Sequence, residues 1–252
     1  MKSYNAIKAL LKKTTLYRRR LRKRNEIRNS QMQYLKHYFA EESVDMLRSF
    51  SEALNKAGIK FWLEFGTLLG YYREHGFIAH DLDIDMGTYY ENATAVRAAL
   101  ENAGFKLVRE YKVLDDGGME HCYLFRHITI DVFFFRKDGN VMFCNSFYNI
   151  LKADLTKKRY ANKRIRMGVK RIEVPVMDYV PAKFYDCDVY VPTDTDHYLR
   201  VHYGDSYMIP NPRYDNKKDS TNIIWFDYKE KPGEALLKLP YFGRPEDYGM
   251  ID

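Results

Sequence analysis

The chain has 252 residues, of which 46% are hydrophobic and 15% aromatic, so it can bury a substantial core and is not globally disordered. Its formal net charge of +7 resides in the first 30 residues. Without them, Lys and Arg fall from 41 to 30 and Asp and Glu from 34 to 33, which leaves a net charge of −3. A nucleic-acid-binding domain carries positive charge on its body, so no nucleic-acid partner is expected.

Residues 1–30 form a basic tail with eleven Lys or Arg and one acid. Within it, Ile7, Leu10, Tyr17 and Leu21 recur at helical spacing, which predicts a narrow apolar stripe on a basic helix. Such a helix can lie on an anionic membrane surface, or it can be a solvated extension. We therefore divide the chain into this tail and one folded domain at residues 31–252.

The remaining signals of location favour the cytoplasm. No apolar run reaches the roughly 20 residues that span a bilayer, and the basic N-terminus lacks the apolar segment of a signal peptide. The cysteines Cys122, Cys144 and Cys187 are odd in number and widely spaced, as is typical of a reducing compartment. The sequence predicts a cytoplasmic protein that is peripheral on the inner face of the membrane.

Hydrophobic periodicity predicts alternating helices and strands, with a short helix opening at the Gly66–Gly70 break and a hairpin at Asp138-Gly139. We expect helices at 32–57, 91–103 and 194–203, and strands at 59–65, 82–86, 105–112, 121–127, 128–135, 141–147 and 171–176. Residues 157–171 are basic and lack a clear period, so we expect them to be irregular. From Gly204 onward the composition indicates an extended wrap.

Three acids alternate with apolar residues over 81–86, so Asp81, Asp83 and Asp85 are expected on one face of a strand. Carboxylates about 4 Å apart repel by roughly 4 kcal/mol at an effective dielectric constant near 20. A divalent cation relieves that repulsion, and oxygen ligands select Mg²⁺ or Mn²⁺. Asp131 is the lone charge of an apolar strand and is expected to share this metal site.

The acidic run is also compatible with other motifs. An EF-hand requires Gly and Glu at its sixth and twelfth positions, where this chain has Met86 and Asn92, so that motif is excluded. A DxD glycosyltransferase motif and a solvated, acidic strand end both remain open at this point.

A phosphate-binding element is predicted just before the acids. The break at Gly66, Thr67 and Gly70 aims backbone N–H groups at an anion. Arg73 can bind a phosphate bidentately, although it can equally form a surface salt bridge. His80 lies beside the acids, where it can contact a bound substrate or serve as a neutral filler.

The segment FGTLLGYYREHGFIAHDLDID, from Phe65 to Asp85, resembles the signature of the LicD/fukutin family. Residues 130–133 are similar to the acidic strand that follows in that family, and residues 191–210 are similar to its closing segment. The chain departs from the family pattern at Glu74, where His is usual, at Ala79 and His80, which replace Pro-Trp, and at Leu82, which replaces an acid. These differences affect substrate identity more than reaction type.

The resemblance implies an α+β fold of the nucleotidyltransferase (DNA polymerase β-like) type, with a mixed sheet flanked by helices and a basic N-terminal helical tail. It also implies Mg²⁺- or Mn²⁺-dependent transfer of a phospho-alcohol group, such as phosphocholine, from a CDP-linked alcohol donor. The acceptor would be a hydroxyl of a glycan or lipid-linked glycan, as in lipopolysaccharide or capsule.

By the same resemblance, Asp83 and Asp85 bind the metal, Asp81 is a neighbour or further ligand, and Asp131 is the last acid and a base. Gly66 and Thr67 hold the donor phosphates, assisted by Arg73. Three alternatives remain: a nucleotidyltransferase that releases pyrophosphate, a DxD glycosyltransferase and a binding module without activity. The glycosyltransferase would need a longer nucleotide-binding half before the acids.

Overall fold

The computed structural model describes residues 15–151, 155, 157–211, 213–215, 219–240 and 243–250. The α-helices among them are α2 (Thr15–Lys56), α3 (Phe65–Leu69), α4 (Ala93–Asn102) and α5 (Thr195–Tyr203). A π-helical turn, Gly70–Glu74, continues α3, and short 3₁₀ turns lie at Tyr90–Asn92, Lys158–Tyr160 and Pro245–Tyr248. The strands are β1 (Phe61–Leu63), β2 (Ile84–Tyr89), β3 (Lys106–Val113), β4 (Met119–Phe125), β5 (Ile128–Asp138), β6 (Val141–Tyr148), β7 (Lys163–Pro175), β8 (Tyr179–Phe184), β9 (Cys187–Pro192), β10 (Ile223–Trp225) and β11 (Gly233–Leu237).

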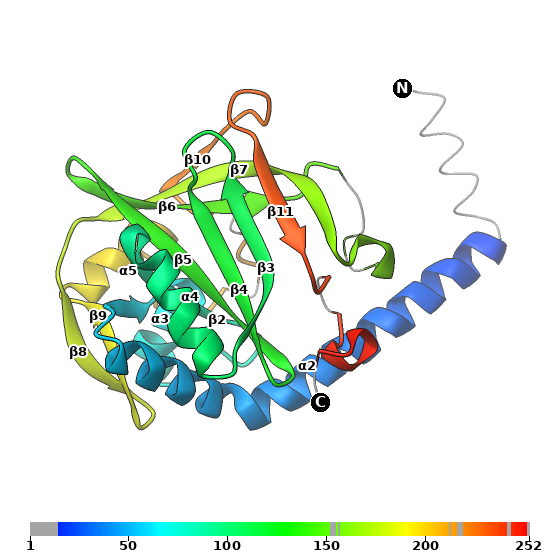
Figure 1. The fold of residues 1–252 in the computed structure, drawn as a ribbon, viewed down its shortest axis with the longest axis horizontal. Coiled ribbons are helices and arrows are strands. Elements are labelled where there is room, and N and C mark those ends of the chain that lie inside the picture. The colour runs from blue at the N-terminus through cyan, green and yellow to red at the C-terminus, as the bar shows by residue number, and fades with distance from the viewer. Residues whose placement is uncertain are drawn as a thin grey trace.

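Nine of the strands form one curved sheet in the order β1-β2-β5-β4-β3-β11-β7-β10, and β6 bridges β5 and β7. Because β5 pairs with both β4 and β6, the strands β5, β4, β3, β11, β7 and β6 close into a ring. Every pairing is antiparallel except that of β2 with β5. Figure 1 shows this curved sheet with β8 and β9, which form a separate hairpin, at one side.

The predicted fold class, a nucleotidyltransferase-type mixed sheet flanked by helices, is therefore wrong. The described part of the chain is a mostly antiparallel sheet with few helices. The error arises in the second half of the chain. Residues 157–171 were expected to be irregular and only 171–176 to be a strand, but β7 already begins at Lys163. Ile165, Met167 and Val169 are buried and alternate with exposed Arg164 and Arg166, as on a strand with one solvated face.

The closing strand was also missed. β11 lies in the segment expected to be an extended wrap, and it inserts between β3 and β7. Its burial alternates, and Ala235 and Leu237 pack with Tyr111, Ile165 and Met167 in a second buried cluster. These contacts are between residues far apart in the chain, so no local sequence pattern predicts them.

Helix α2 begins in the basic tail and continues without a break to Lys56. Its buried positions start at Phe39, and in Figure 1 its N-terminal half extends beyond the sheet. Residues 1–14, including Ile7 and Leu10 of the predicted stripe, lie outside the described residues. Within the described ranges, no helix combines the length and the apolar character needed to cross a bilayer.

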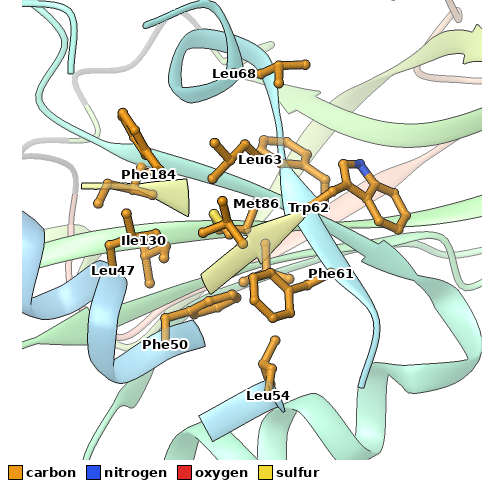
Figure 2. Close-up of a cluster of buried hydrophobic side chains, with 14 of the residues drawn as sticks. Leu47, Phe50, Leu54, Phe61, Trp62, Leu63, Leu68, Met86, Ile130 and Phe184 are labelled. Carbon is orange, nitrogen blue, oxygen red and sulfur yellow. The ribbon is translucent and has the colours of Figure 1, made fainter. Parts of the chain in front are cut away.

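The main core lies between α2, β1 and the parallel pair β2 and β5. In Figure 2, Phe50 and Leu54 of α2 lie close to Phe61 of β1. The next residue of β1, Trp62, stacks on Tyr179 with ring centroids 4.0 Å apart. A side chain at Gly87 would overlap the Trp62 indole, so this glycine permits close packing of β2. The core thereby fixes the positions of β2 and β5, which carry Asp85 and Asp131.

Candidate active site

A cavity of about 610 Å³ opens where α3, β2 and β5 meet the segment after α5. Its lining contains the acids of 81–85, Asp131, Gly66, Arg73 and His80 from the sequence prediction, together with residues that were not predicted. The lining is completed by Phe65, Leu69, Ile78, Glu120, Phe133, Ser146, Lys170, Ile172, His202, Tyr203, Ser206, Tyr207, Ile209, Pro210, Asn211, Tyr214 and Ile223.

Three carboxylates converge in this cavity. Asp83, Asp85 and Asp131 each offer an oxygen, and these oxygens lie within 4.8 Å of one another. The parallel register of β2 and β5 places Asp85 directly beside Asp131. Asp131 Oδ1 is buried and has no hydrogen-bond partner among the described residues. A divalent cation fits this oxygen set, since it would satisfy that atom and separate the like charges.

The three acids of 81–85 were expected on one strand, but they do not all lie on it. β2 begins at Ile84, so Asp85 is its second residue and Asp81 and Asp83 precede it in a turn. Asp81 lies against α3, where a side chain at Gly66 would overlap its carboxylate. The turn, rather than strand alternation, brings the three acids together.

The electrostatics of the cluster follow from burial and like charge. The pKa of Asp81 is raised to about 8, first by burial and then by the hydrogen bond and charge of Asp83. Burial also raises the pKa of Asp85 well above its ordinary value, and the neighbouring carboxylates add to this effect. Burial raises the pKa of Asp131 as well, against the opposing charge of Arg109. At neutral pH the cluster therefore retains protons unless a cation replaces them.

The predicted phosphate-binding residues take two different positions. Gly66 lines the cavity. Thr67 is only 3% exposed and lies beneath the cavity wall, where its Oγ1 accepts a hydrogen bond from the Asp85 N–H at 2.9 Å. Thr67 thus holds the start of β2 against α3, while Gly66 leaves room for the Asp81 carboxylate.

Arg73 and His80 lie at the border of the cavity. The Arg73 guanidinium donates from Nη1 to the Tyr207 carbonyl at 2.9 Å and from Nη2 to Glu74 Oε1 at 2.7 Å. Arg73 therefore ties the π-helical turn to the closing segment. His80 is exposed beside Asp81.

The polar lining residues that sequence reasoning missed include Glu120 on β4, Ser146 on β6, Lys170 on β7 and His202 on α5. Burial lowers the pKa of His202 to about 4, and its Nδ1 lies 2.9 Å from Asn222 Oδ1, so the ring is neutral at pH 7. Glu120 carried a usable signal, because it is an isolated acid in an apolar strand, as Asp131 is. Lys170 carried no such sequence signal, since the segment around it was expected to be irregular.

Residues 58–176, which include all of the acids discussed, match the family model described as LicD/FKTN/FKRP, nucleotidyltransferase domain. Human ribitol-5-phosphate transferase FKTN is 26% identical over 193 residues, which cover 74% of this chain and 38% of FKTN. Human ribitol 5-phosphate transferase FKRP is 28% identical over 171 residues, or 65% of this chain and 31% of FKRP. An uncharacterized protein of Rickettsia prowazekii (strain Madrid E) is 26% identical over 207 residues, 77% of this chain and 69% of that protein.

Proposed function

Because this chain contains a LicD family domain, we propose that it is a phosphotransferase that moves a phospho-alcohol group onto a glycan hydroxyl. The observation that carries this proposal is the convergence of Asp83, Asp85 and Asp131 in a cavity. The names of FKTN and FKRP, both ribitol-phosphate transferases, support transfer of this kind of group. The chain spans less than two fifths of the length of either relative.

In the fuller form of the proposal, the donor is a CDP-linked alcohol, with a phosphocholine-like or related group. The acceptor is a cell-surface glycan or its lipid-linked precursor, such as lipopolysaccharide or capsule. Asp83, Asp85 and Asp131 would hold Mg²⁺ or Mn²⁺, with Asp81 as a neighbour or further ligand. A bound cation supplies charge neutralisation for the donor diphosphate.

The residues of the chain position the reacting groups. The backbone at Gly66 and the Arg73 guanidinium flank the donor phosphates, and the segment tied down by Arg73 limits access of water. The acceptor hydroxyl attacks the phosphorus that carries the alcohol, the new P–O bond forms, and the bond to CMP breaks. Asp131 or a neighbouring carboxylate accepts the hydroxyl proton.

A donor screen tests the proposal. The full chain is incubated with Mg²⁺ and CDP-choline, CDP-ethanolamine, CDP-glycerol or CDP-ribitol, and CMP release is measured. We expect release from at least one donor, and a loss of at least about 100-fold in Asp83→Asn or Asp85→Asn with little change in melting temperature. Asp188→Asn, an exposed change on β9, is the matched control.

Two results would contradict this assignment. Pyrophosphate release from a nucleoside triphosphate, without CMP release from any CDP-alcohol, would indicate transfer of a nucleotide instead. Wild-type turnover by Asp85→Asn at saturating Mg²⁺ would show that the three carboxylates do not act as proposed.

We further propose that the basic tail holds a cytoplasmic protein at the anionic inner face of a membrane. The exposed cations of α2 support this proposal: Arg18, Arg19, Arg20, Arg22, Lys23, Arg24 and Arg28. Each contributes about 1 kcal/mol near an anionic bilayer, so neutralising Arg18, Arg19 and Arg20 to Gln should weaken vesicle binding by roughly fivefold per residue. Sedimentation with phosphatidylserine vesicles measures this, with neutral phosphatidylcholine vesicles as control. Unchanged vesicle binding after deletion of residues 1–30 would show that the tail does not bind the membrane.

A further inference from the structure

Glu120, Ser146 and Lys170 form a polar wall of the cavity that the mechanism above does not use. Ser146 and Lys170 are direct partners across β6 and β7. Glu120 lies opposite Phe133, as Cys122 lies opposite Asp131 two residues along the same strands. Alternation along β4 and β5 therefore places Glu120 on the same face as Asp131.

Glu120 is incompletely satisfied in this position. The residue is 8% exposed, and its Oε2 atom is buried without a hydrogen-bond partner among the described residues. Ser146 lines the same part of the cavity, and its hydroxyl group lowers the pKa of the carboxyl group against the larger effect of burial. A buried acceptor without a donor is costly to the fold, so a second donor at Oε2 is the feature that a bound molecule would supply.

The surrounding charge restricts what that molecule can be. Lys170 is close enough for its positive charge to act on Glu120. A cationic head group, such as choline, would therefore meet like charge from Lys170. Burial raises the pKa of Glu120 to about 8, so its carboxyl group is largely protonated and neutral at pH 7. A neutral hydroxyl suits both, because it donates to a carboxyl oxygen and accepts from an ammonium group.

We propose that Glu120, together with Ser146 and Lys170, binds hydroxyl groups of a neutral polyhydroxy group. Two sources share this chemistry: the alcohol carried by the donor and a sugar of the acceptor. The inference rests on the proposed function for the reaction in which this group takes part, but the binding itself requires no turnover.

Equilibrium binding to the full chain tests the inference. Calorimetry in the presence of Mn²⁺ compares CDP-glycerol, CDP-choline and CMP, and saturation-transfer NMR probes methyl galactoside as a simple glycan. If the donor alcohol is the ligand, Glu120→Gln weakens CDP-glycerol binding at least tenfold and leaves CMP within twofold. If the acceptor is the ligand, the same variant abolishes the methyl galactoside signal and leaves CDP-glycerol within twofold.

Two further variants separate recognition from a structural effect. Glu110→Gln makes the same chemical change on β3, outside the cavity lining, and should leave all probes unchanged. Lys170→Met removes the repulsion of cations, so it should raise the affinity for CDP-choline relative to CDP-glycerol at least tenfold when the donor alcohol is the ligand. When the acceptor is the ligand, Lys170→Met should instead weaken methyl galactoside.

The inference is overturned if the wild-type chain binds neither CDP-glycerol more tightly than CMP nor methyl galactoside, or if Glu120→Gln alters neither. Loss of one bound Mn²⁺ equivalent in Glu120→Gln would also overturn it, because Glu120 would then be a cation ligand. Failure of the proposed function has a different signature: no CDP-alcohol yields CMP, while polyol binding still depends on Glu120.

Discussion

Glu64 is a buried carboxyl beneath the candidate site that takes no direct part in it. It is 1% exposed, and its Oε2 accepts hydrogen bonds from Trp62 Nε1 at 2.7 Å and from the Tyr198 hydroxyl at 2.8 Å. Burial raises its pKa to about 7, although these hydrogen bonds favour the ionised form. The fold therefore tolerates a partly protonated acid at the point where β1 passes into α3.

Glu64 makes stability depend on pH in a definite direction. A carboxyl with a raised pKa binds more protons in the folded state, so the free energy of unfolding falls as pH rises from about 4.5 to about 7, by roughly 3 kcal/mol for this residue. Glu64→Gln keeps an acceptor for Trp62 and Tyr198 but cannot ionise. We expect urea unfolding between pH 5 and 8 to show a flatter pH dependence in the variant.

Other buried acids contribute equally to the pH dependence of both proteins, so the difference between the two slopes isolates Glu64. Parallel slopes would mean that Glu64 is already ionised across this range in the folded protein.

At the scale of elements, the site depends on how α3 is attached to β2. Thr67 Oγ1 is the acceptor for the Asp85 N–H, and it lies in a buried position. Thr67→Val has nearly the same shape but leaves that N–H without this acceptor, which should cost about 1–3 kcal/mol of stability. It should also lower transfer activity, because Asp85 is no longer held in place.

Thr67→Ser keeps the hydroxyl and is the matched control for this prediction. Urea denaturation and Mn²⁺ titration of both variants provide the measurement. Equal stability and equal Mn²⁺ affinity in Val and Ser variants would show that the hydroxyl does not position Asp85.

At the scale of the whole molecule, binding of a divalent cation should be coupled to folding. Asp131 comes from β5, Asp85 from the start of β2 and Asp83 from the segment just before β2, so only the folded chain brings their oxygens together. Mg²⁺ or Mn²⁺ at about 100 times its dissociation constant should then stabilise the fold by about 2.7 kcal/mol, and Asp85→Asn should abolish the effect. Differential scanning calorimetry with and without the cation measures it, with Asp188→Asn as control.

The size of this stabilisation should increase with pH. The pKa of Asp81 is raised to about 8 and that of Asp85 is raised well above its ordinary value, so protons compete with the cation at pH 6 more than at pH 8. A cation-induced shift in melting temperature that is equal at both pH values would contradict this competition.

Local sequence patterns correctly predicted elements whose determinants are neighbours in the chain. The hairpin between β5 and β6 turns at Asp138-Gly139, with Asp138 paired to Val141, because the turn residues specify it. The position of α4 follows from its apolar spacing and the Gly104 stop. The proximity of Asp83 and Asp85 required only that the two residues are close in the sequence, one just before β2 and one at its start.

The sequence by itself thus determined which chemical groups the site can use: a run of acids, a glycine break before it and one further acid in an apolar strand. Only the tertiary structure decided that β11 closes the sheet and that β4, β6 and β7 add Glu120, Ser146 and Lys170 to the cavity. The physical reason is that these pairings join segments far apart in the chain. The register of each pairing depends on burying the apolar side chains of both strands together, and neither segment alone encodes that register.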